Sequence, residues 1–218
     1  MKRRLVILLT ITLSSSNFIF ASTKQVEIEE ASHAESFQYS DPVGGRYRTL
    51  TILVGGKVVR ALRGENSRGG TFERIDPPVL SAGGNFVFLS QIESGEVEVL
   101  SGSTVNHEVA YCELVEVRSG CIIARETGEF CGGAFTKDGK WENVLYPEFN
   151  LISEAPKAKK YVDGTLKFSE SPVSSFENLL ACDPPGFNNK NYYRALINQN
   201  SFNLDGAQRE RFEQSFKN

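Results

Sequence analysis

Short runs in which apolar and polar residues alternate fill most of the chain between residues 46 and 168, and this period of two is typical of half-buried β-strands. The runs 46–54 and 57–63 are rich in β-branched side chains and are separated only by Gly55-Gly56. Because glycine accepts the positive φ angles of a type I′ turn, the two runs are predicted to form a hairpin. Such a turn places Ile52 opposite Val59.

Further runs of the same kind follow at the spacing of hairpins. The strands that they predict are 85–92, 96–100, 109–117, 122–125, 141–146, 160–162 and 165–168. Residues 93–95 are expected to turn between the first two of these, and Asp163-Gly164 is a second type I′ signal between the last two. About nine short antiparallel strands in all indicate a sandwich or a barrel-like sheet.

The hydrophobic period changes near residue 171. Ser171 and Pro172 have the residue types of a helix N-cap and a first helical position. After them, apolar residues recur at helical spacing as far as residue 180, and two further helices are predicted at 189–199 and 205–216.

The predicted domain organisation has three parts. Residues 46–218 form a single α+β domain that is predominantly antiparallel β, with two or three helices over about 171–218 packed on the sheet. Residues 22–45 are expected to be a polar N-terminal arm, and regular structure is expected to begin only at residue 46. Residues 1–21 are expected to be a signal peptide.

The first residues have the order of a secretory signal peptide. Lys2, Arg3 and Arg4 precede an apolar run at 5–13, and Ala21 offers a small residue at the cleavage point. An uncleaved membrane anchor would need roughly 18 or more continuous apolar residues, about twice the length of this run. Export is therefore predicted, to the periplasm in a Gram-negative cell and otherwise to the extracellular space.

The net charge argues against one class of partner. The chain has 24 Lys and Arg against 27 Asp and Glu, and removal of residues 1–21 takes away three basic groups and leaves 21 − 27 = −6. Nucleic-acid binders carry clustered Lys and Arg, so nucleic acid is not an expected partner. No second long apolar run is present in the sequence, so membrane insertion of the mature chain is not expected either. An acidic chain fits a protein partner that carries basic groups.

The four cysteines are an even number in a chain predicted to be exported, so two disulfides are expected. They do not form a Cys-x-x-Cys pair, and no zinc site is predicted. In the predicted hairpin Cys121 lies at the turn and Cys112 about 15 Å away, which exceeds the roughly 7 Å that a disulfide spans. The next hairpin, expected around residues 125–128, would bring Cys121 and Cys131 nearly opposite each other. The favoured pairing is therefore Cys121–Cys131 with Cys112–Cys182, while Cys112–Cys131 with Cys121–Cys182 stays open.

The sequence offers few candidates for catalysis. Of the two histidines, His33 lies in the polar arm, while His107 has Ser101, Ser103 and Glu108 nearby, the residue types of a Ser–His–carboxylate set. No Gly-x-Ser-x-Gly elbow accompanies them. Sequence patterns for zinc, calcium and phosphate binding are absent, so no catalytic, metal or cofactor site is predicted.

One group of carboxylates indicates a binding surface. Glu96 and Glu98 alternate with valines, which puts both carboxylates on one face of a strand. Together with glutamates of the following strands, the expected partner-binding set is Glu96, Glu98, Glu113, Glu116 and Glu129. Such a set would speed association with a basic protein. The same alternation is also typical of a solvated outer face.

Export, two disulfides, an acidic mature chain and the lack of catalytic motifs favour a non-enzymatic binding protein. The functional hypothesis is an inhibitor or immunity-type protein that occludes the active site of a toxin or lytic enzyme. The alternative is a secreted hydrolase that acts on cell-wall or glycan material through carboxylates or His107.

Overall fold

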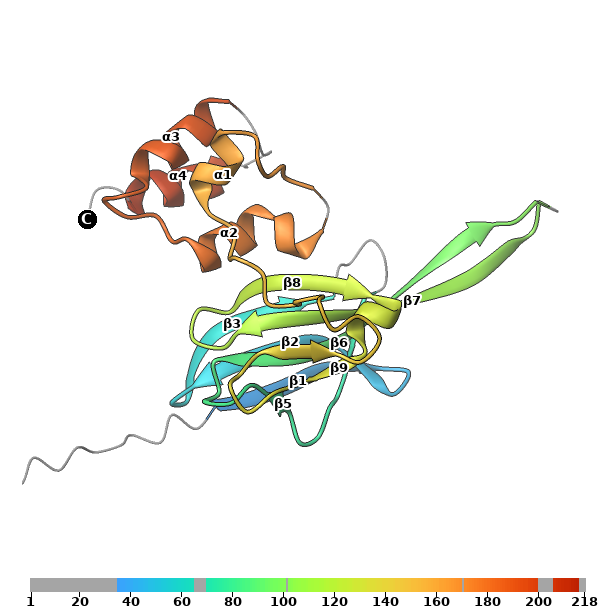
Figure 1. The fold of residues 1–218 in the computed structure, drawn as a ribbon. Helices are drawn as coiled ribbons and strands as arrows, with labels where there is room; N and C mark the ends of the chain where they lie inside the picture. The colour runs from blue at the N-terminus through green and yellow to red at the C-terminus, as the bar shows by residue number, and fades with distance from the viewer. Residues whose placement is uncertain (1–34, 65–69, 101, 170, 200–205, 216–218) are drawn as a thin grey trace, which may run out of the picture. The chain divides into compact units, whose positions relative to one another are not determined.

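The computed structural model describes residues 35–64, 70–100, 102–169, 171–199 and 206–215 (Figure 1). The predicted signal peptide, the arm as far as residue 34 with His33, and Ser101 lie outside these ranges. The described chain consists of antiparallel strands followed by short helices, which confirms the predicted α+β fold.

Eight of the described strands form one sheet. They are β1 (Glu35–Val43), β2 (Arg46–Val54), β3 (Lys57–Arg63), β4 (Thr71–Glu73), β5 (Val79–Leu80), β6 (Phe86–Glu98), β7 (Thr104–Glu116) and β8 (Cys121–Thr127). All pairs are antiparallel in the order β1-β2-β4-β6-β7-β8, with β3 also paired to β2 and β5 to β6. A separate two-stranded sheet joins β9 (Gly133–Phe135) to β10 (Trp141–Asn143).

The first residues that the structure describes already form β1, where the sequence predicted a polar arm as far as residue 45. β1 pairs with β2 along its length, and Phe37 and Tyr39 pack against the core of the sheet. The alternation of these two aromatic residues with polar ones is a strand signal, but Pro42 interrupts the pattern. An edge strand accepts a proline because the missing N–H is not needed for a ladder on that side.

The hairpin at Gly55-Gly56 is confirmed, with φ angles of 56° and 74° at the two glycines. Its predicted register is wrong, because a bulge after Ile52 places that residue opposite Arg60 instead of Val59. A bulge adds one unpaired residue to a strand and leaves no trace in the alternation pattern.

The turn predicted at residues 93–95 is also wrong. β6 continues through this segment and stays paired with β7 as far as Glu98 opposite Thr104. The chain turns at residues 99–103 instead, where Gly102 has a φ of 75° and donates its N–H to the carbonyl of Val99 (2.8 Å). The glycine at position 95 lies within the strand.

Short helical segments follow the sheet: α1 (Ala158–Val162), η2 (Pro172–Ser174), α2 (Phe176–Cys182), α3 (Lys190–Asn198) and α4 (Gly206–Ser215). The last two confirm the helices predicted at 189–199 and 205–216. The N-cap of α2 is Ser175, whose Oγ accepts the backbone N–H of Asn178, and not Ser171 as predicted. The Ser171-Pro172 pair begins the 3-10 turn η2 one turn earlier.

The hairpin predicted around Asp163-Gly164 is a helix end. Gly164, with a φ of 76°, ends α1, as glycine commonly does just after a helix. Ala158 and Tyr161 of α1 are buried with Tyr193 of α3 in a cluster shared by the helices. This packing selects the helix, because most of the stability of a short helix comes from tertiary contacts.

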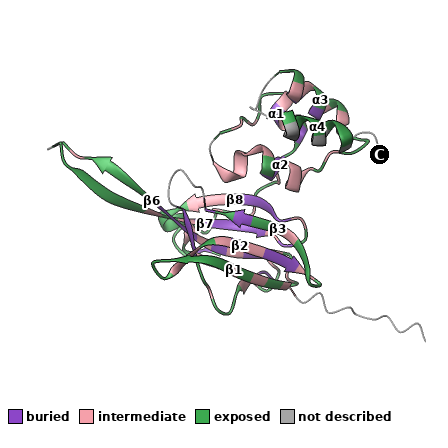
Figure 2. Cartoon of the chain, turned by 180° about the vertical axis from the view of Figure 1, so that it is seen from behind, coloured by how far each residue is buried: buried purple, intermediate pink, exposed green. Residues whose placement is uncertain are grey.

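The buried residues of the large sheet lie on both of its faces, as the four consecutive buried residues 112–115 of β7 show (Figure 2). Val115 belongs to one cluster, which is Leu50, Ile52, Leu62, Phe72, Val87, Leu89, Val115, Val117 and Ile122. Its neighbour Leu114 belongs to a second cluster, together with Trp141 and Leu151. Val173 of η2 packs against the first cluster as well, so segments that follow β8 contribute to the packing on both faces.

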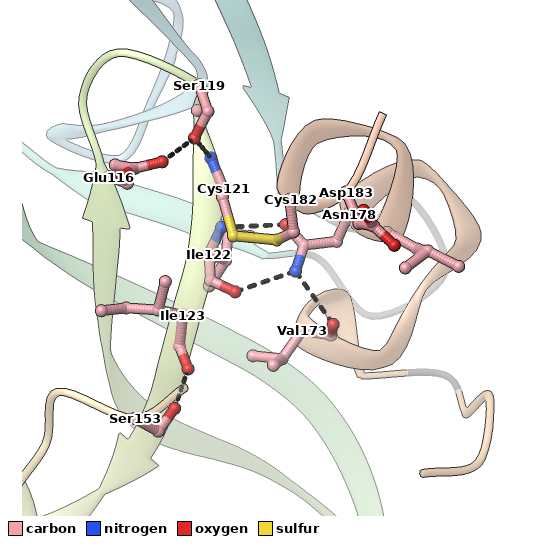
Figure 3. Close-up of a disulfide and its surroundings, with 12 residues drawn as sticks. Glu116, Ser119, Cys121, Ile122, Ile123, Ser153, Val173, Asn178, Cys182 and Asp183 are labelled. Atoms are coloured by element: carbon pink, nitrogen blue, oxygen red, sulfur yellow. Dashed lines mark hydrogen bonds between the residues drawn. A yellow bond between two sulfur atoms is a disulfide. The ribbon is translucent and has the colours of Figure 1, made fainter. Parts of the chain in front are cut away.

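All four cysteines form disulfides as predicted, but the favoured pairing is wrong. The bridges are Cys112–Cys131 and Cys121–Cys182, with Cα–Cα distances of 5.6 and 4.7 Å. After β8 the chain forms a 3-10 turn, η1 (Gly128–Cys131), instead of a hairpin, and this turn brings Cys131 beside Cys112. Cys121, at the start of β8, then binds Cys182 at the end of α2 (Figure 3).

Candidate binding ribbon

Strands β6 and β7 extend beyond the rest of the large sheet as a two-stranded ribbon, residues 93–98 and 104–109 (Figure 1). β4 pairs with β6 only as far as Ile92, and β8 pairs with β7 only from Tyr111 onward. Within the described part of the chain, the ribbon therefore has no strand on either outer edge. Figure 2 shows that the ribbon is exposed along most of its length.

One face of the ribbon is apolar. Val97 lies opposite Val105, and the two residues are 47 % and 45 % exposed. His107 and Val109 share this face, because strand residues two apart point to the same side, and a shallow hollow of about 150 Å³ lies among them. Further along β6 the same face carries the buried Leu89. On this side, β6 and β7 are thus buried within the sheet and exposed along the ribbon.

The opposite face of the ribbon is polar and acidic. Glu96 lies opposite Asn106 and Glu98 lies opposite Thr104, and all four residues are exposed. Glu96 and Glu98 therefore project from the same side of a projecting ribbon, not from the middle of a broad sheet. Both carboxylates are exposed to solvent on a ribbon only two strands wide, so a charged partner can reach them.

The root of the ribbon is held by Arg46 of β2. Its Nη1 and Nη2 donate to the two carboxylate oxygens of Glu108, at 3.0 and 3.1 Å. Ser94 of β6 donates to the same carboxylate at 3.0 Å. The hydrogen bond from Arg46 lowers the pKa of Glu108, so the carboxylate stays ionised. This bidentate contact joins β2 to the root of the ribbon.

The remaining glutamates of the predicted binding set lie away from the ribbon. Glu129 belongs to η1 and accepts a hydrogen bond from the hydroxyl of Tyr146 (2.6 Å). Glu116 accepts one from Ser119 at the turn between β7 and β8. Glu113 is only 1 % exposed, so the structure removes it from the surface. A polar residue in an alternating strand is expected to face water, and here that expectation fails because a cation lies opposite.

Glu113 belongs to a buried group of polar side chains around Arg125 of β8. Nη2 of Arg125 donates to Oε1 of Gln91 (2.9 Å) and to Glu93, and Nε lies 3.2 Å from Oε1 of Glu113. This last contact is an ion pair only, because neither atom has a hydrogen-bond partner among the described residues. The guanidinium also lies 3.5 Å from the ring centre of Tyr111. One guanidinium thus lies beside two buried carboxyl groups and can balance the negative charge of only one of them.

Stability is expected to depend on pH through Glu113. Burial raises the pKa of Glu113 to about 7, against the opposing effect of the nearby Arg125 and Arg60. The folded chain therefore keeps a proton that the unfolded chain releases near pH 4.5. The stability linked to this proton is complete below that pH and is lost as the pH rises toward 7, by up to about 1.4 kcal/mol per pH unit.

The side chain of the variant Glu113→Gln cannot ionise, so its free energy of unfolding is not expected to fall in this way between pH 4.5 and pH 7. Urea denaturation of both proteins between these two pH values measures the effect. Parallel curves of stability against pH for the two proteins would contradict the prediction.

The Ser–His–carboxylate set considered from the sequence is not brought together. His107 and Glu108 are neighbours in β7 and therefore point to opposite faces of the ribbon. The carboxylate of Glu108 contacts Arg46 and Ser94 instead. Ser103 lies in the exposed turn at the ribbon tip.

The outer edge of β8, unlike the edges of the ribbon, is covered by side chains (Figure 3). Asn178 of α2 accepts the N–H of Ile122 through Oδ1 (2.9 Å) and donates from Nδ2 to the carbonyl of Ile122 (2.8 Å). Ser153 donates to the carbonyl of Ile123. Asn178 is fully buried, and its signal in the sequence was a polar residue inside an apolar helical stripe.

No family model, curated protein or solved structure matches this chain. Among the described residues, no group of three or more His, Cys, Asp and Glu side chains is placed to hold a metal ion. The helices of the described ranges are too short or too polar to cross a membrane.

Proposed function

We propose that this protein is an exported, non-enzymatic binding protein of the inhibitor or immunity type, and that the ribbon enters the active-site cleft of a basic partner protein. The observation that carries the proposal is the two-faced ribbon, whose outer edges have no strand partner in the described chain. A ribbon of this kind is narrow enough for a cleft and presents apolar, acidic and main-chain groups together.

Each of these groups contributes to binding in a different way. Burial of Val97, Val105 and the exposed Leu100 would contribute about 1.5–3 kcal/mol for each side chain that becomes fully buried. The free N–H and C=O groups of the edges can pair with an extended segment of the partner. Glu96 and Glu98 attract a basic surface, which raises the association rate more than the affinity.

The contrast between the strand edges also supports a role in recognition. An unpaired edge exposes a protein to aggregation, and proteins usually protect such edges. Here Asn178 and Ser153 cover β8, whereas the ribbon keeps its edges open in the described chain. An edge left open next to a covered one is consistent with a surface kept for a partner.

The cysteines and the N-terminal sequence support a site of action outside the cytosol. Two disulfides fit a protein that is secreted from the reducing cytosol. The predicted signal peptide at residues 1–21 would direct the chain to the periplasm or the extracellular space. The partner would be met there.

Changes to the apolar face of the ribbon test the proposal. The double variant Val97→Asp/Val105→Asp is expected to weaken inhibition by about 100-fold or more, because about 3 kcal/mol of apolar burial is lost. The measurement is titration of a panel of purified basic lytic enzymes, muramidases and nucleases, with the mature protein. Val58→Asp is the matched control, because Val58 is 64 % exposed on β3, outside the ribbon.

Three outcomes would contradict the proposal. One is the absence of stoichiometric inhibition across the panel, and another is inhibition that the ribbon variant leaves unchanged. The third is turnover of peptidoglycan by the protein itself, which would favour the alternative of a secreted hydrolase.

A further inference from the structure

A cavity of about 410 Å³ lies where β3 faces η2 and α2. No residue of the ribbon lines it. The volume lies in the range of sites for small molecules. Leu62 and Phe72 form apolar walls of the cavity. Polar side chains such as Gln91, Glu113 and Glu177 also line it. The cavity is therefore a second candidate site, independent of the ribbon.

The inner end of the cavity carries two buried polar side chains, Glu113 and Gln91, each 1 % exposed. Oε1 of Glu113 has no hydrogen-bond partner among the described residues. Gln91 accepts a hydrogen bond from Arg125 through its oxygen, and its amide group is the donor that this side chain offers to a ligand. A buried carboxyl oxygen that makes no hydrogen bond is unfavourable, so a ligand that donates a hydrogen bond to Glu113 would be stabilised.

The charged groups of the lining are equal in number. Arg60 and Arg63 are basic, and Glu113 and Glu177 are acidic, although burial raises the pKa of Glu113 to about 7 and its charge at neutral pH is therefore only partial. Arg60 already donates to the backbone carbonyl of Gly120 and to Asn178, at 2.6 Å each. A ligand with a net charge would therefore leave one sign unmatched inside a cavity that is partly closed from water, which is unfavourable.

We propose that this cavity binds a small neutral molecule that carries several hydroxyl groups and has about the size of a monosaccharide. A hydroxyl group both donates and accepts hydrogen bonds, so neighbouring hydroxyls can donate to Glu113 and accept from Gln91. An ammonium group only donates and a carboxylate only accepts, so neither serves both side chains. The apolar walls at Leu62 and Phe72 suit the C–H face of such a molecule.

Isothermal titration of the mature protein at neutral pH tests this inference. The neutral probes are glucose, N-acetylglucosamine and inositol, with putrescine as the cationic probe and citrate as the anionic one. We expect saturable binding of at least one neutral probe at a single site. Glu177→Trp, at the mouth of the cavity, should weaken it by about tenfold or more, because the indole fills the entrance. Glu148→Trp is the control, because this exposed residue is not part of the lining.

The outcomes separate this inference from the proposed function. Binding of putrescine or citrate in preference to all neutral probes, or equal binding by the protein and Glu177→Trp, would overturn it. Failure of every neutral probe to bind at millimolar concentration would overturn it as well. The ribbon variant Val97→Asp/Val105→Asp should bind the neutral probe as the unchanged protein does, so loss of enzyme inhibition and loss of probe binding are distinguishable.

Discussion

Replacing Arg125 with Met is expected to lower the free energy of unfolding by about 3–5 kcal/mol. The side chain of Arg125 is 9 % exposed and forms ion pairs with Glu93 and Glu113, whose side chains are 9 % and 2 % exposed. Without the guanidinium, two buried carboxylates lose their only ion-pair partner in the described chain. Both side chains are then left buried without a cation, which is unfavourable. The shift of the urea midpoint at constant slope measures the loss.

Two further variants show whether burial is the cause. Arg74→Met breaks the ion pair with Asp76, whose side chains are 57 % and 69 % exposed, and should change stability by less than about 1 kcal/mol. Adding Glu93→Gln and Glu113→Gln to Arg125→Met should restore part of the lost stability, because neutral amides need no cation. An Arg125→Met protein as stable as the unchanged one would contradict the prediction.

Removing the Cys121–Cys182 disulfide is expected to destabilise the fold by about 4 kcal/mol in the chain-entropy model. This bridge closes a loop with a sequence separation of 61, whereas Cys112–Cys131 closes one of 19 and is expected to contribute about 3 kcal/mol. The longer loop gives the unfolded chain more freedom when the bridge is absent. Guanidinium denaturation of the two Cys→Ala double variants measures the difference.

The order of the two losses decides this prediction. A smaller loss for Cys121→Ala/Cys182→Ala than for Cys112→Ala/Cys131→Ala would contradict it. Peptide mapping of the unreduced protein provides a separate check, because it should recover Cys121 linked to Cys182. The Cys121–Cys182 bridge also links α2 to β8. Its removal should therefore weaken binding in the cavity, because Glu177 of α2 lines the mouth.

Local sequence signals predicted most of the elements but not how they meet. The alternation along β2 and the Gly55-Gly56 pair predicted a hairpin, because glycine at positive φ is a property of the turn alone. The same dihedral preference at Gly164 ended a helix instead. The choice there depends on whether Tyr161 finds a buried place among the helices, and residues distant in the sequence supply that place.

The candidate sites follow the same division. The alternation of Val97 with Glu96 and Glu98 predicts that the strand has two different faces. It does not predict that Val97 stays half exposed in the described chain. The buried position of Glu113 was missed because its cation lies on the next strand, twelve residues away in the sequence and directly opposite in space.

By itself, the sequence determined the α+β class, the positions of most strands, the last two helices and the use of all four cysteines. The tertiary structure alone decided which cysteines pair, where β6 and β7 leave the sheet, and which carboxylate is buried. The physical reason is the distance along the sequence between the residues that interact. Alternation, turn glycines and helical stripes depend on neighbours within a few residues, whereas pairing and burial depend on contacts such as Asn178 with Ile122, fifty-six positions apart.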